Sequence, residues 1–407
     1  MNLDYLTLND FELRDKRVLL RLDINTPLDP STNQILDDSR IAAARPTLDA
    51  LAHAKVAILS HQSRPGRGDF TSLAQHAQIL QRNCSQNVRF VEDIIGPTAR
   101  DAIRALRRGE VLVLDNVRLL AEETLEESGE KLARTNFVTR LAPLFDLYVN
   151  DAFAAAHRSQ ASLVAFPYVL PSAAGKLMEK ELRALERLLV EPGRPSAYIL
   201  GGAKVEDKVP VIENILGTGK ADHVLVGGNV AKVFLKAKGV KFCPSEEEEL
   251  TNVTDEILKA SSILRKYHGR ITIPKDFGTE KDHKRVDTKI GRLGKAGRAL
   301  DIGEETAAEF ADIIARSRTV VGTGPMGVFE QDGFDVGTRI VLEAMANSGA
   351  FTVIGGGHMS GFAGILGIAD RFSHVSTAGG AMLSLLAGEE LPAIVALTHA
   401  AKRHKGT

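Results

Sequence analysis

Short hydrophobic runs alternate with longer amphipathic segments along most of the chain. The runs are rich in Val, Leu and Ile, which is typical of strands that are buried in a parallel sheet. In the longer segments apolar residues recur every three or four positions; in Ser39–His53 these are Ile41, Ala44, Leu48 and Leu51. Such spacing predicts a helix, and strands that alternate with helices predict an α/β fold with crossover helices.

This alternation occurs twice, once on each side of a long predicted helix. The first set of predicted strands is Val18–Asp23, Val56–Ser60, Val88–Val91, Val111–Leu114 and Leu147–Asn150. The second set is Ala197–Leu200, His223–Val226, Ile271–Ile273, Thr319–Val321, Phe351–Ile354 and His374–Ser376. Between them, Lys176–Leu189 carries a leucine stripe, and Pro192 and Gly193 follow it as helix-ending residues.

We therefore expect an α/β protein with two doubly wound parallel-sheet (Rossmann-like) domains joined by a long helix that serves as a hinge. The length agrees, because 407 residues exceed the roughly 250–300 at which a single core stops growing. We assign residues 1–172 to an N-terminal domain, residues 173–190 to the helix between the domains and residues 191–390 to a C-terminal domain.

Charge and composition exclude several classes of protein. Lys and Arg total 51 against 52 for Asp and Glu, which argues against a general nucleic-acid or membrane-surface binder. Cys84 and Cys243 have no spacing typical of a disulfide framework or a zinc site. The N-terminus has no signal-peptide pattern and no apolar stretch is long enough for a membrane span, so we expect a soluble, cytoplasmic protein. We interpret Glu246–Glu249 and Lys402–Lys405 as solvated segments.

Basic residues follow the predicted strands of the first half. Because ligands of open parallel sheets bind beyond the carboxyl ends of the strands, these residues should share one edge. Converging arginines repel one another unless an anion lies between them, and the arginine fork suits carboxylate and phosphate. The set predicts an anion site, with Asp23 and Asn25 beside it. Its cationic and imidazole members are Arg40, His61, Arg64, Arg118, His157 and Arg158.

Glycines follow the predicted strands of the second half. Glycine lets the backbone approach a ligand and point its N–H groups at phosphate oxygens. Lys204 and Lys208 supply positive charge, and Glu330 is placed to accept ribose hydroxyls. The segments predict a nucleotide site; they are Gly201–Lys208, Gly227–Asn229, Gly322–Gly327 and Gly355–His358.

Two functions other than that of a kinase remain open on these patterns. Gly322–Gly327 matches G-x-G-x-x-G, the fingerprint of a nicotinamide-dependent dehydrogenase, although Pro325 removes an N–H donor and the match falls late in its domain. A non-catalytic two-lobed anion-binding protein would explain the arginines but not the glycine loops. The sequence contains no P-loop motif and no H-E-x-x-H motif.

The chain resembles phosphoglycerate kinases over long motifs that run in order from about residue 16 to the last helix. The form of Ser60–Pro65, together with His358, resembles archaeal members most. The motifs are Arg21–Pro27, Ser60–Pro65, Tyr148–Phe153 with His157 and Arg158, Leu177–Leu182, Gly201–Lys208, Gly324–Glu330 and Ser373–Thr377.

This resemblance implies reversible transfer of a phosphoryl group from 1,3-bisphosphoglycerate to ADP, which gives 3-phosphoglycerate and ATP after domain closure. The implied triose ligands are Asp23, Ile24, Asn25, Arg40, His61, Gln62, Ser63, Arg64, Arg118 and Arg158. The implied nucleotide ligands are Gly202, Lys204, Lys208, Gly324, Glu330, Gly355, Gly356, Gly357 and His358. Arg40, Lys204 and Lys208 would neutralise charge on the transferred group, and residues 391–407 would return to the first domain.

Three positions depart from the pattern of the family. His358 stands where bacterial and eukaryotic members have a magnesium-binding aspartate, so we expect Mg²⁺ to be held by ADP or ATP and water, without a protein ligand. Gly322-Thr323 replaces the usual Trp-Asn, and Met359 replaces a small hydroxyl residue. We expect a monomer without a nucleic-acid or membrane partner.

Overall fold

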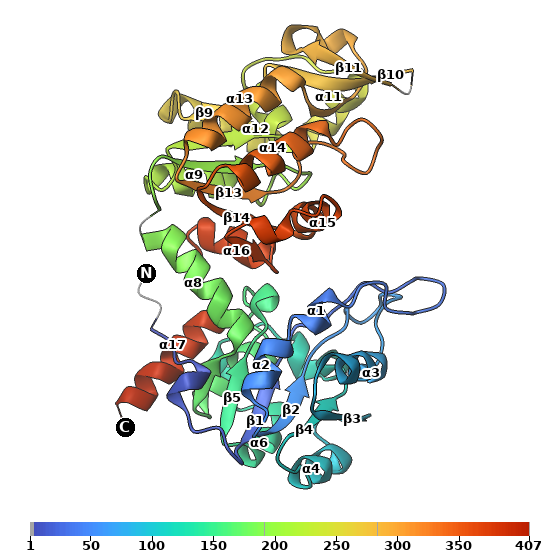
Figure 1. Cartoon of the computed structure of the whole chain (residues 1–407), viewed down its shortest axis with the longest axis vertical. Coiled ribbons are helices and arrows are strands. Elements are labelled where there is room, and N and C mark those ends of the chain that lie inside the picture. Colours follow the sequence, from blue (N-terminus) through green and yellow to red (C-terminus); the bar gives the residue numbers. More distant parts are fainter. Residues whose placement is uncertain (1–3, 191, 283, 407) are drawn as a thin grey trace. The chain divides into compact units, whose positions relative to one another are not determined.

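The computed structural model describes residues 4–190, 192–282 and 284–406, which form two compact units (Figure 1). Unit 1 runs up to Arg183 and includes the residues from Glu390 onward, and unit 2 runs from Ala184 to Glu389. The division falls inside α8, Lys176–Val190, the helix that the leucine stripe predicted. None of the helices in the described ranges has the length and apolar composition needed to cross a membrane.

Unit 1 contains a sheet of six parallel strands in the order β3-β4-β2-β1-β5-β6. The strands are β1 Arg17–Arg21, β2 Lys55–Leu59, β3 Asn87–Val91, β4 Glu110–Leu114, β5 Leu147–Asn150 and β6 Ser172–Ala174. The helices other than α8 are α1 Ser39–Ala42, α2 Arg45–Ala50, α3 Ala74–Asn83, α4 Pro97–Arg104, α5 Gly129–Leu132, α6 Asn136–Leu141, α7 Ala161–Val164 and α17 Pro392–Lys405. Among the six strands of this sheet, only the short β6 was not predicted.

Unit 2 contains a second sheet of six parallel strands, in the order β15-β14-β13-β7-β8-β9. The strands are β7 Ser196–Leu200, β8 His223–Val226, β9 Ile271–Thr272, β13 Thr319–Thr323, β14 Phe351–Gly355 and β15 His374–Ser376. The helices are α9 Val209–Gly217, α10 Gly228–Ala237, α11 Pro244–Thr251, α12 Thr254–Lys266, α13 Glu304–Arg316, α14 Val336–Asn347, α15 Gly357–Ile365 and α16 Gly380–Leu386.

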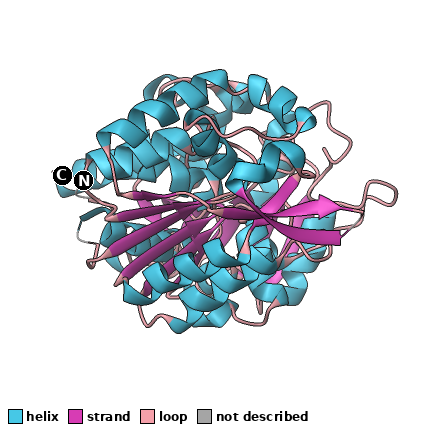
Figure 2. Ribbon diagram, turned by 90° about the horizontal axis from the view of Figure 1, so that it is seen from above, coloured by secondary structure: helices cyan, strands magenta, loops and turns pink. Residues whose placement is uncertain are grey.

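Helices cover both faces of the parallel sheets, as Figure 2 shows. The strands are therefore buried on both sides, which is why they read as continuous hydrophobic runs. In unit 1, Val18 and Leu20 belong to the core on one face of β1, and the intervening Leu19 is buried as well. The predicted fold class of two doubly wound parallel sheets is confirmed.

The prediction of a single helix over Ser39–His53 was wrong. The segment forms two short helices, α1 and α2, with a break at Ala43 and Ala44. Pro46 lies in the first turn of α2, where its missing N–H is tolerated. In one continuous helix its ring would clash with the carbonyl of Ala42, four residues earlier, so the chain restarts at Arg45.

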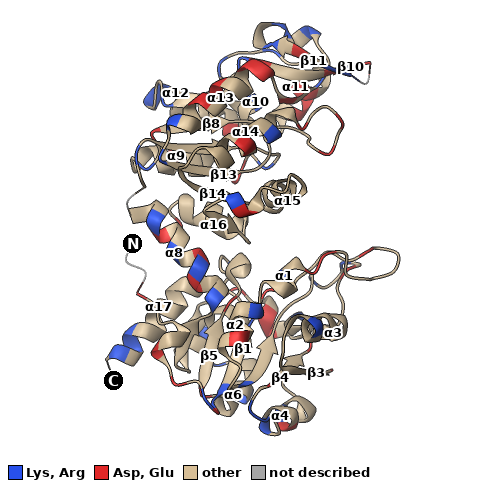
Figure 3. Cartoon of the chain, in the orientation of Figure 1, with Lys and Arg blue, Asp and Glu red and all other residues tan. Residues whose placement is uncertain are grey.

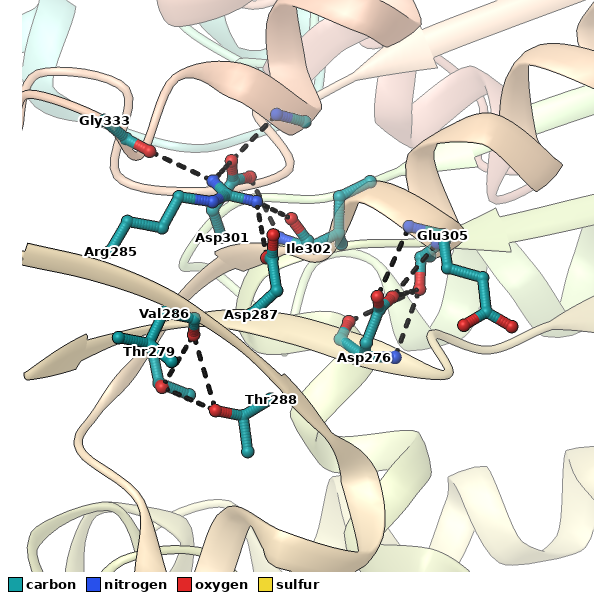
Figure 4. A network of polar contacts seen from close by, with 12 residues as sticks. Asp276, Thr279, Arg285, Val286, Asp287, Thr288, Asp301, Ile302, Glu305 and Gly333 are labelled. Atoms are coloured by element: carbon teal, nitrogen blue, oxygen red, sulfur yellow. Dashed lines mark hydrogen bonds and ion pairs between the residues drawn. The ribbon is translucent and has the colours of Figure 1, made fainter.

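A three-stranded antiparallel sheet in unit 2 was not predicted. Its order is β11-β10-β12, with β10 Asp276–Lys281, β11 Lys284–Lys289 and β12 Ala299–Ile302. Val286 is the single apolar residue of β11, so no hydrophobic run marks the strand. The sheet is held on one side by Arg285, which donates to buried Asp301 at 2.8 Å and to Asp287 at 3.1 Å (Figure 4). Burial raises the pKa of Asp301 to about 6.

The interpretation of Glu246–Glu249 as a solvated segment was wrong for its first residue. The side chain of Glu246 is 1% exposed and accepts from Lys232 Nζ at 2.6 Å and from the backbone N–H of Ala299 at 3.1 Å. Glu247 pairs with Lys236, which lies one helical turn beyond Lys232 on α10. The α11 helix therefore places two glutamates against two lysines of α10, which a charge count along the sequence does not reveal.

The segment Lys402–Lys405, which we interpreted as solvated, also makes specific contacts with unit 1. Arg403 donates to the carbonyls of Tyr168 and Leu170, and Lys405 pairs with Asp4 at 2.6 Å. These contacts continue the packing of α17 against α7 and β6. The end of the chain is thereby fastened to unit 1 by polar contacts.

Replacing Lys232 with Met should destabilise unit 2 strongly, because it leaves the Glu246 carboxylate buried without its cation. We expect the free energy of unfolding of unit 2, measured in urea, to fall by about 3–5 kcal/mol. Lys236→Met is the matched control, since its pair with Glu247 is about one-third exposed and should cost less than about 1 kcal/mol. Equal losses for the two variants would contradict this account.

Candidate functional site

The predicted anion site of unit 1 lies at the carboxyl edge of its sheet. β1 pairs with both β2 and β5 in parallel, so the segments that follow these three strands leave from the same edge. From β1 the chain goes to β2 on one side, whereas β5 lies on the other side, which makes this a topological switch point. Asp23, His61 and Arg158 reach the edge from these three segments. The structure thus brings together residues that are far apart in the sequence.

His61 lies at the centre of this edge, between two guanidinium groups. Arg21 Nη2 is 3.2 Å from Nδ1 of the ring, and Arg158 Nη1 is 3.3 Å from Nε2. Burial, followed by the charges of Arg21, Arg118 and Arg158, holds the pKa of His61 well below its ordinary value. A neutral imidazole can accept only one hydrogen bond, so one guanidinium N–H faces the ring without an acceptor. An anionic ligand would supply it.

Arg21 is fully buried, and a short chain of hydrogen bonds holds it in place. Its Nε donates to Ser162 Oγ at 2.8 Å, and Ser162 Oγ donates in turn to Glu123 Oε1 at 2.5 Å. The backbone N–H of Ser162 donates to the other oxygen of Glu123 at 2.7 Å. Burial raises the pKa of Glu123 and the charge of Arg21 opposes that shift. Ser162 therefore links a buried carboxylate to a buried guanidinium.

Next to His61, three arginines line a cavity of about 650 Å³. They are Arg64, Arg118 and Arg158, and His157 joins them. Arg118 donates to the carbonyl of Ser63, and burial together with the charge of Arg158 lowers the pKa of Arg118 to about 10. Arg118 therefore stays charged at neutral pH. A positively charged cavity of this kind favours an anion.

Three other predicted residues belong to the segments at this sheet edge but lie outside the cavity lining. Arg40 Nη1 pairs with Asp23 at 3.0 Å, and 39% of the Arg40 side chain remains exposed. Asn25 Oδ1 accepts from the backbone N–H of Ser63 at 2.8 Å, which ties the first loop to the second. Ile24 is buried in the core, so it reaches the edge only through its backbone.

Gln62 is fully buried, and it joins the loops that carry the site. Its Oε1 accepts from the backbone N–H of Thr26 at 3.0 Å, and its Nε2 donates to the carbonyl of Thr26 at 2.9 Å. His76 Nε2 lies 3.0 Å from the same Oε1. With its amide engaged in this way, Gln62 positions the loops around Asn25 and Ser63.

In unit 2 the loops after β7 and β13 are hydrogen-bonded and closely packed against each other at the topological switch point of the sheet. Gly202 N donates to the carbonyl of Pro325 at 2.7 Å. A Cβ atom on Gly201 would lie 2.3 Å from that same carbonyl oxygen, and one on Gly324 would lie 2.2 Å from the carbonyl oxygen of Gly201. These glycines are thus required for loop packing, whatever ligand the loops bind.

The loop between β14 and α15 has backbone that no neighbouring atom crowds. Gly356 has φ +94° and precedes α15, and a Cβ atom on Gly357 would meet no atom within 4 Å. The first N–H groups of α15 have no helical partner and favour an anion. Lys204 is exposed, whereas Lys208 is buried; its Nζ donates to the carbonyl of Lys204 at 3.3 Å, and burial lowers its pKa.

A cavity of about 190 Å³ lies beside these loops. Three of the predicted nucleotide residues line it, namely Gly202, Glu330 and His358. The other predicted nucleotide residues, Lys204, Lys208, Gly324 and Gly355–Gly357, lie outside its lining. Its apolar wall was not predicted, because it comes from the antiparallel sheet and the loop after β13: Phe277, Ala299, Leu300 and Val328. An apolar wall beside glycine loops suits a nucleotide base.

The departures at Gly322 and Met359 belong to one packing arrangement. Gly322 lies inside β13, and a Cβ atom there would be 3.2 Å from Met345 Sδ and 3.3 Å from Met359 Cε. The two buried methionines thus occupy the space beside a residue that is tryptophan in the usual family pattern. Because Gly322 is a strand residue and the next helix begins only at Val336, Gly322–Gly327 does not open a helix as a dinucleotide fingerprint would.

Two doubly wound sheets, one with arginines and the other with glycine loops at its carboxyl edge, are the features expected of a two-unit α/β phosphotransferase. Comparison with known proteins agrees, because residues 8–389 match the phosphoglycerate kinase family. The chain belongs to the phosphoglycerate kinase family.

Individual relatives cover almost the whole chain. A phosphoglycerate kinase of Methanobacterium bryantii is 42% identical over 98% of each chain, and one of Methanococcus maripaludis is 44% identical over 98% of this chain and 100% of its own. The crystal structure of phosphoglycerate kinase from Pyrococcus horikoshii OT3 matches with a TM-score of 0.90 at 41% identity, and that from Coxiella burnetii with 0.80 at 34%; each covers 98% of this chain and 100% of its own. The resemblance to archaeal members is confirmed.

Acid should destabilise unit 1 through His76. Burial lowers the pKa of His76 to about 4 from an ordinary 6.5, so between these values the unfolded chain binds a proton that the folded chain does not. Stability is therefore full above pH 6.5 and falls toward pH 4, by up to about 3 kcal/mol for this residue. His76→Gln should flatten the pH dependence of unfolding in this range. The exposed His53→Gln is the control, and the same flattening in both variants would contradict the assignment.

Removing the hydroxyl of Ser162 should destabilise unit 1, because Arg21 Nε and a Glu123 oxygen both lose a buried partner. We expect Ser162→Ala to lower the free energy of unfolding by about 2–4 kcal/mol. Ser159→Ala is the matched control, because that hydroxyl only donates to the carbonyl of Glu127 near the surface. A loss of less than about 1 kcal/mol for Ser162→Ala would mean that the link is not needed.

Proposed function

We propose that this chain transfers a phosphoryl group reversibly between 1,3-bisphosphoglycerate and ADP, giving 3-phosphoglycerate and ATP. Family membership supports this reaction. The observation that carries the proposal is the arrangement around His61, where the guanidinium groups of Arg21, at the end of β1, and Arg158, after β5, meet at one sheet edge. A neutral imidazole can accept from only one of them. A small trianion such as 3-phosphoglycerate provides the missing acceptors.

The triose would be held at the cavity of unit 1. Arg64, Arg118 and Arg158 line that cavity and supply forked donors for its phosphate and carboxylate oxygens. Asp23 and Asn25, which contact Arg40 and Ser63, would orient these loops or bind a hydroxyl of the triose. Ser63 and Gln62 would act through the loop backbone that they hold.

The nucleotide would be held at the glycine loops of unit 2. The apolar wall that contains Phe277 and Leu300 suits the base, and Glu330 on the cavity rim suits the ribose hydroxyls. The phosphates would then meet Lys204 and the open backbone of Gly356 and Gly357. Lys208 would add a second, less exposed charge.

The chemistry needs alignment and charge neutralisation more than proton transfer. The acceptor in the direction of ATP use is a carboxylate with a pKa of about 3–4, which is already ionised at neutral pH. No general base is then required. Rate acceleration comes from bringing the acceptor oxygen and the phosphorus atom into line and from stabilising the charge on the transferred group. We assign this stabilisation to Arg40 of unit 1 and Lys204 of unit 2. Both side chains must come within reach of the transferred phosphoryl group during the reaction.

Magnesium would arrive with the nucleotide. Within the described ranges, no group of three or more His, Cys, Asp or Glu side chains is placed to hold a metal ion. The loop after β14 offers His358 in place of a carboxylate, and an imidazole is a poor ligand for this hard cation. We therefore propose phosphate oxygens and water as the magnesium ligands. Both substrate sites come from one chain, which supports a monomer as the active form.

A coupled assay of ATP-dependent phosphorylation of 3-phosphoglycerate tests the proposed reaction. Purified protein should consume NADH through glyceraldehyde-3-phosphate dehydrogenase only when both ATP and 3-phosphoglycerate are present. Turnover that does not need 3-phosphoglycerate, or none at all with a folded protein, would overturn the assignment.

Replacing Arg40 with Ala should lower kcat without weakening nucleotide binding. Loss of a group that stabilises charge mainly in the transition state typically costs about 2–4 kcal/mol, a fall in kcat of roughly 30- to 1,000-fold. The KM for ATP should stay within about twofold, because the nucleotide loops belong to unit 2. Arg45→Ala is the control, since Arg45 pairs only with Asp49 on the exposed side of α2. Near-normal turnover in Arg40→Ala would remove Arg40 from the mechanism.

A further inference from the structure

A second basic cavity lies along the antiparallel sheet of unit 2. It has a volume of about 880 Å³ and shares no lining residue with the nucleotide cavity. Four cationic side chains line it, Lys241, Lys281, Arg292 and Lys295, and no carboxylate does. Figure 3 shows lysine and arginine in the segments around β10 and β11. The cations come from the segment after α10, from β10 and from the 3-10 helix Ile290–Lys295.

These four cations are less closely paired than their neighbours, and Lys241 acts on Glu247 only through its charge, which helps to lower the pKa of that carboxyl group. In the part of unit 2 that the structure describes, none of the four has a carboxylate within ion-pair distance. On the same small sheet, by contrast, Lys289 pairs with Glu305 and Arg298 pairs with Glu249. The chain as a whole carries nearly equal numbers of acidic and basic residues, so the unpaired cations around one cavity are a local feature.

The alternation of the strands keeps acidic groups away from this cavity. Thr279, Lys281 and Val286 belong to one face of the hairpin, as their register across β10 and β11 requires. Arg285 and Asp287 belong to the opposite face, where Figure 4 shows Arg285 joined to both Asp287 and Asp301. Asp287 and Asp301 are thus engaged with Arg285, and Asp276 accepts from Thr306, so these three carboxylates are held away from the cavity.

Unpaired cations around a concave space repel one another, and a bound polyanion would relieve that repulsion. The volume lies in the range of small-ligand sites, about 300–1,000 Å³. Thr288 on the cavity wall adds a hydroxyl to the cationic groups. A hollow of this size favours a small ligand over a nucleic acid.

We propose that this cavity binds a small phosphorylated polyanion, at a site separate from both substrate sites. The inference does not rest on the proposed reaction. The occupant carries several phosphate charges, of the kind found in inorganic tripolyphosphate, which serves as the probe below.

The absence of tryptophan from the chain allows a local reporter. Val286 is 44% exposed and lines the cavity, so Val286→Trp places a single fluorophore at the site. Tripolyphosphate should change its emission saturably with a stoichiometry of one. The control reporter is Leu258→Trp on α12, a residue that is 65% exposed and outside the cavity lining, and its emission should show no saturable change.

Charge removal identifies the site within this reporter background. Arg292→Ala with Lys295→Ala should weaken tripolyphosphate binding at least tenfold. Lys289→Ala with Arg298→Ala removes two cations that have carboxylate partners and should leave the affinity within twofold. No saturable change in Val286→Trp, or equal weakening by the two double variants, would overturn the proposal.

A second measurement needs no reporter and covers the case in which the tryptophan fills the cavity. Isothermal titration of the otherwise unmodified protein should count one more bound tripolyphosphate than titration of the variant with Arg292→Ala and Lys295→Ala. Equal counts in the two proteins would overturn the proposal independently of the fluorescence result.

Discussion

A neutral imidazole held between guanidinium groups is the constraint on which the anion site depends. His61 cannot accept from both Arg21 and Arg158, and it cannot take up a proton easily because burial and the surrounding arginines oppose it. Burying cations in this way costs stability unless they are paired. Glu123 offsets part of that cost for Arg21 through Ser162, whereas Arg64, Arg118 and Arg158 line the cavity. The site is therefore organised before a ligand arrives, with its charge balance left for the ligand to complete.

The two sheets bind anions by different physical means on the same fold. Unit 1 uses side-chain cations from loops that Gln62 and Asn25 hold together. Unit 2 uses backbone that comes close only because Gly201 and Gly324 lack a Cβ atom, together with the open start of α15. Rigid cation placement suits a small ligand with fixed charges, whereas exposed amides suit the phosphate chain of a nucleotide.

Much of this arrangement could be predicted from the sequence, because strand runs, strand-end residues and glycine loops are local signals. The prediction of Arg64, Arg118 and Arg158, and of the four glycine loops of unit 2, follows from that reading. Arg21 was not predicted as a site residue, because it lies inside a strand run. Glu123 and Ser162 were missed, because their role appears only when segments 39 residues apart fold against each other. Phe277 was missed for a related reason: its sheet is polar in sequence and is held by Arg285 and Asp301, not by a hydrophobic run. Pro46 was a local signal for the break between α1 and α2, but the apolar spacing of Ser39–His53 concealed it.

Nuclear magnetic resonance titration of His61 tests the central claim most directly. The His61 signals can be assigned among the 11 histidines by comparison with His61→Gln. Without ligand, the pKa of His61 should lie well below 6.5, because burial and the neighbouring arginines oppose its protonation. With 3-phosphoglycerate bound, it should rise, since the anion neutralises those arginines. A pKa near 6.5 that does not move when the ligand is added would contradict the account.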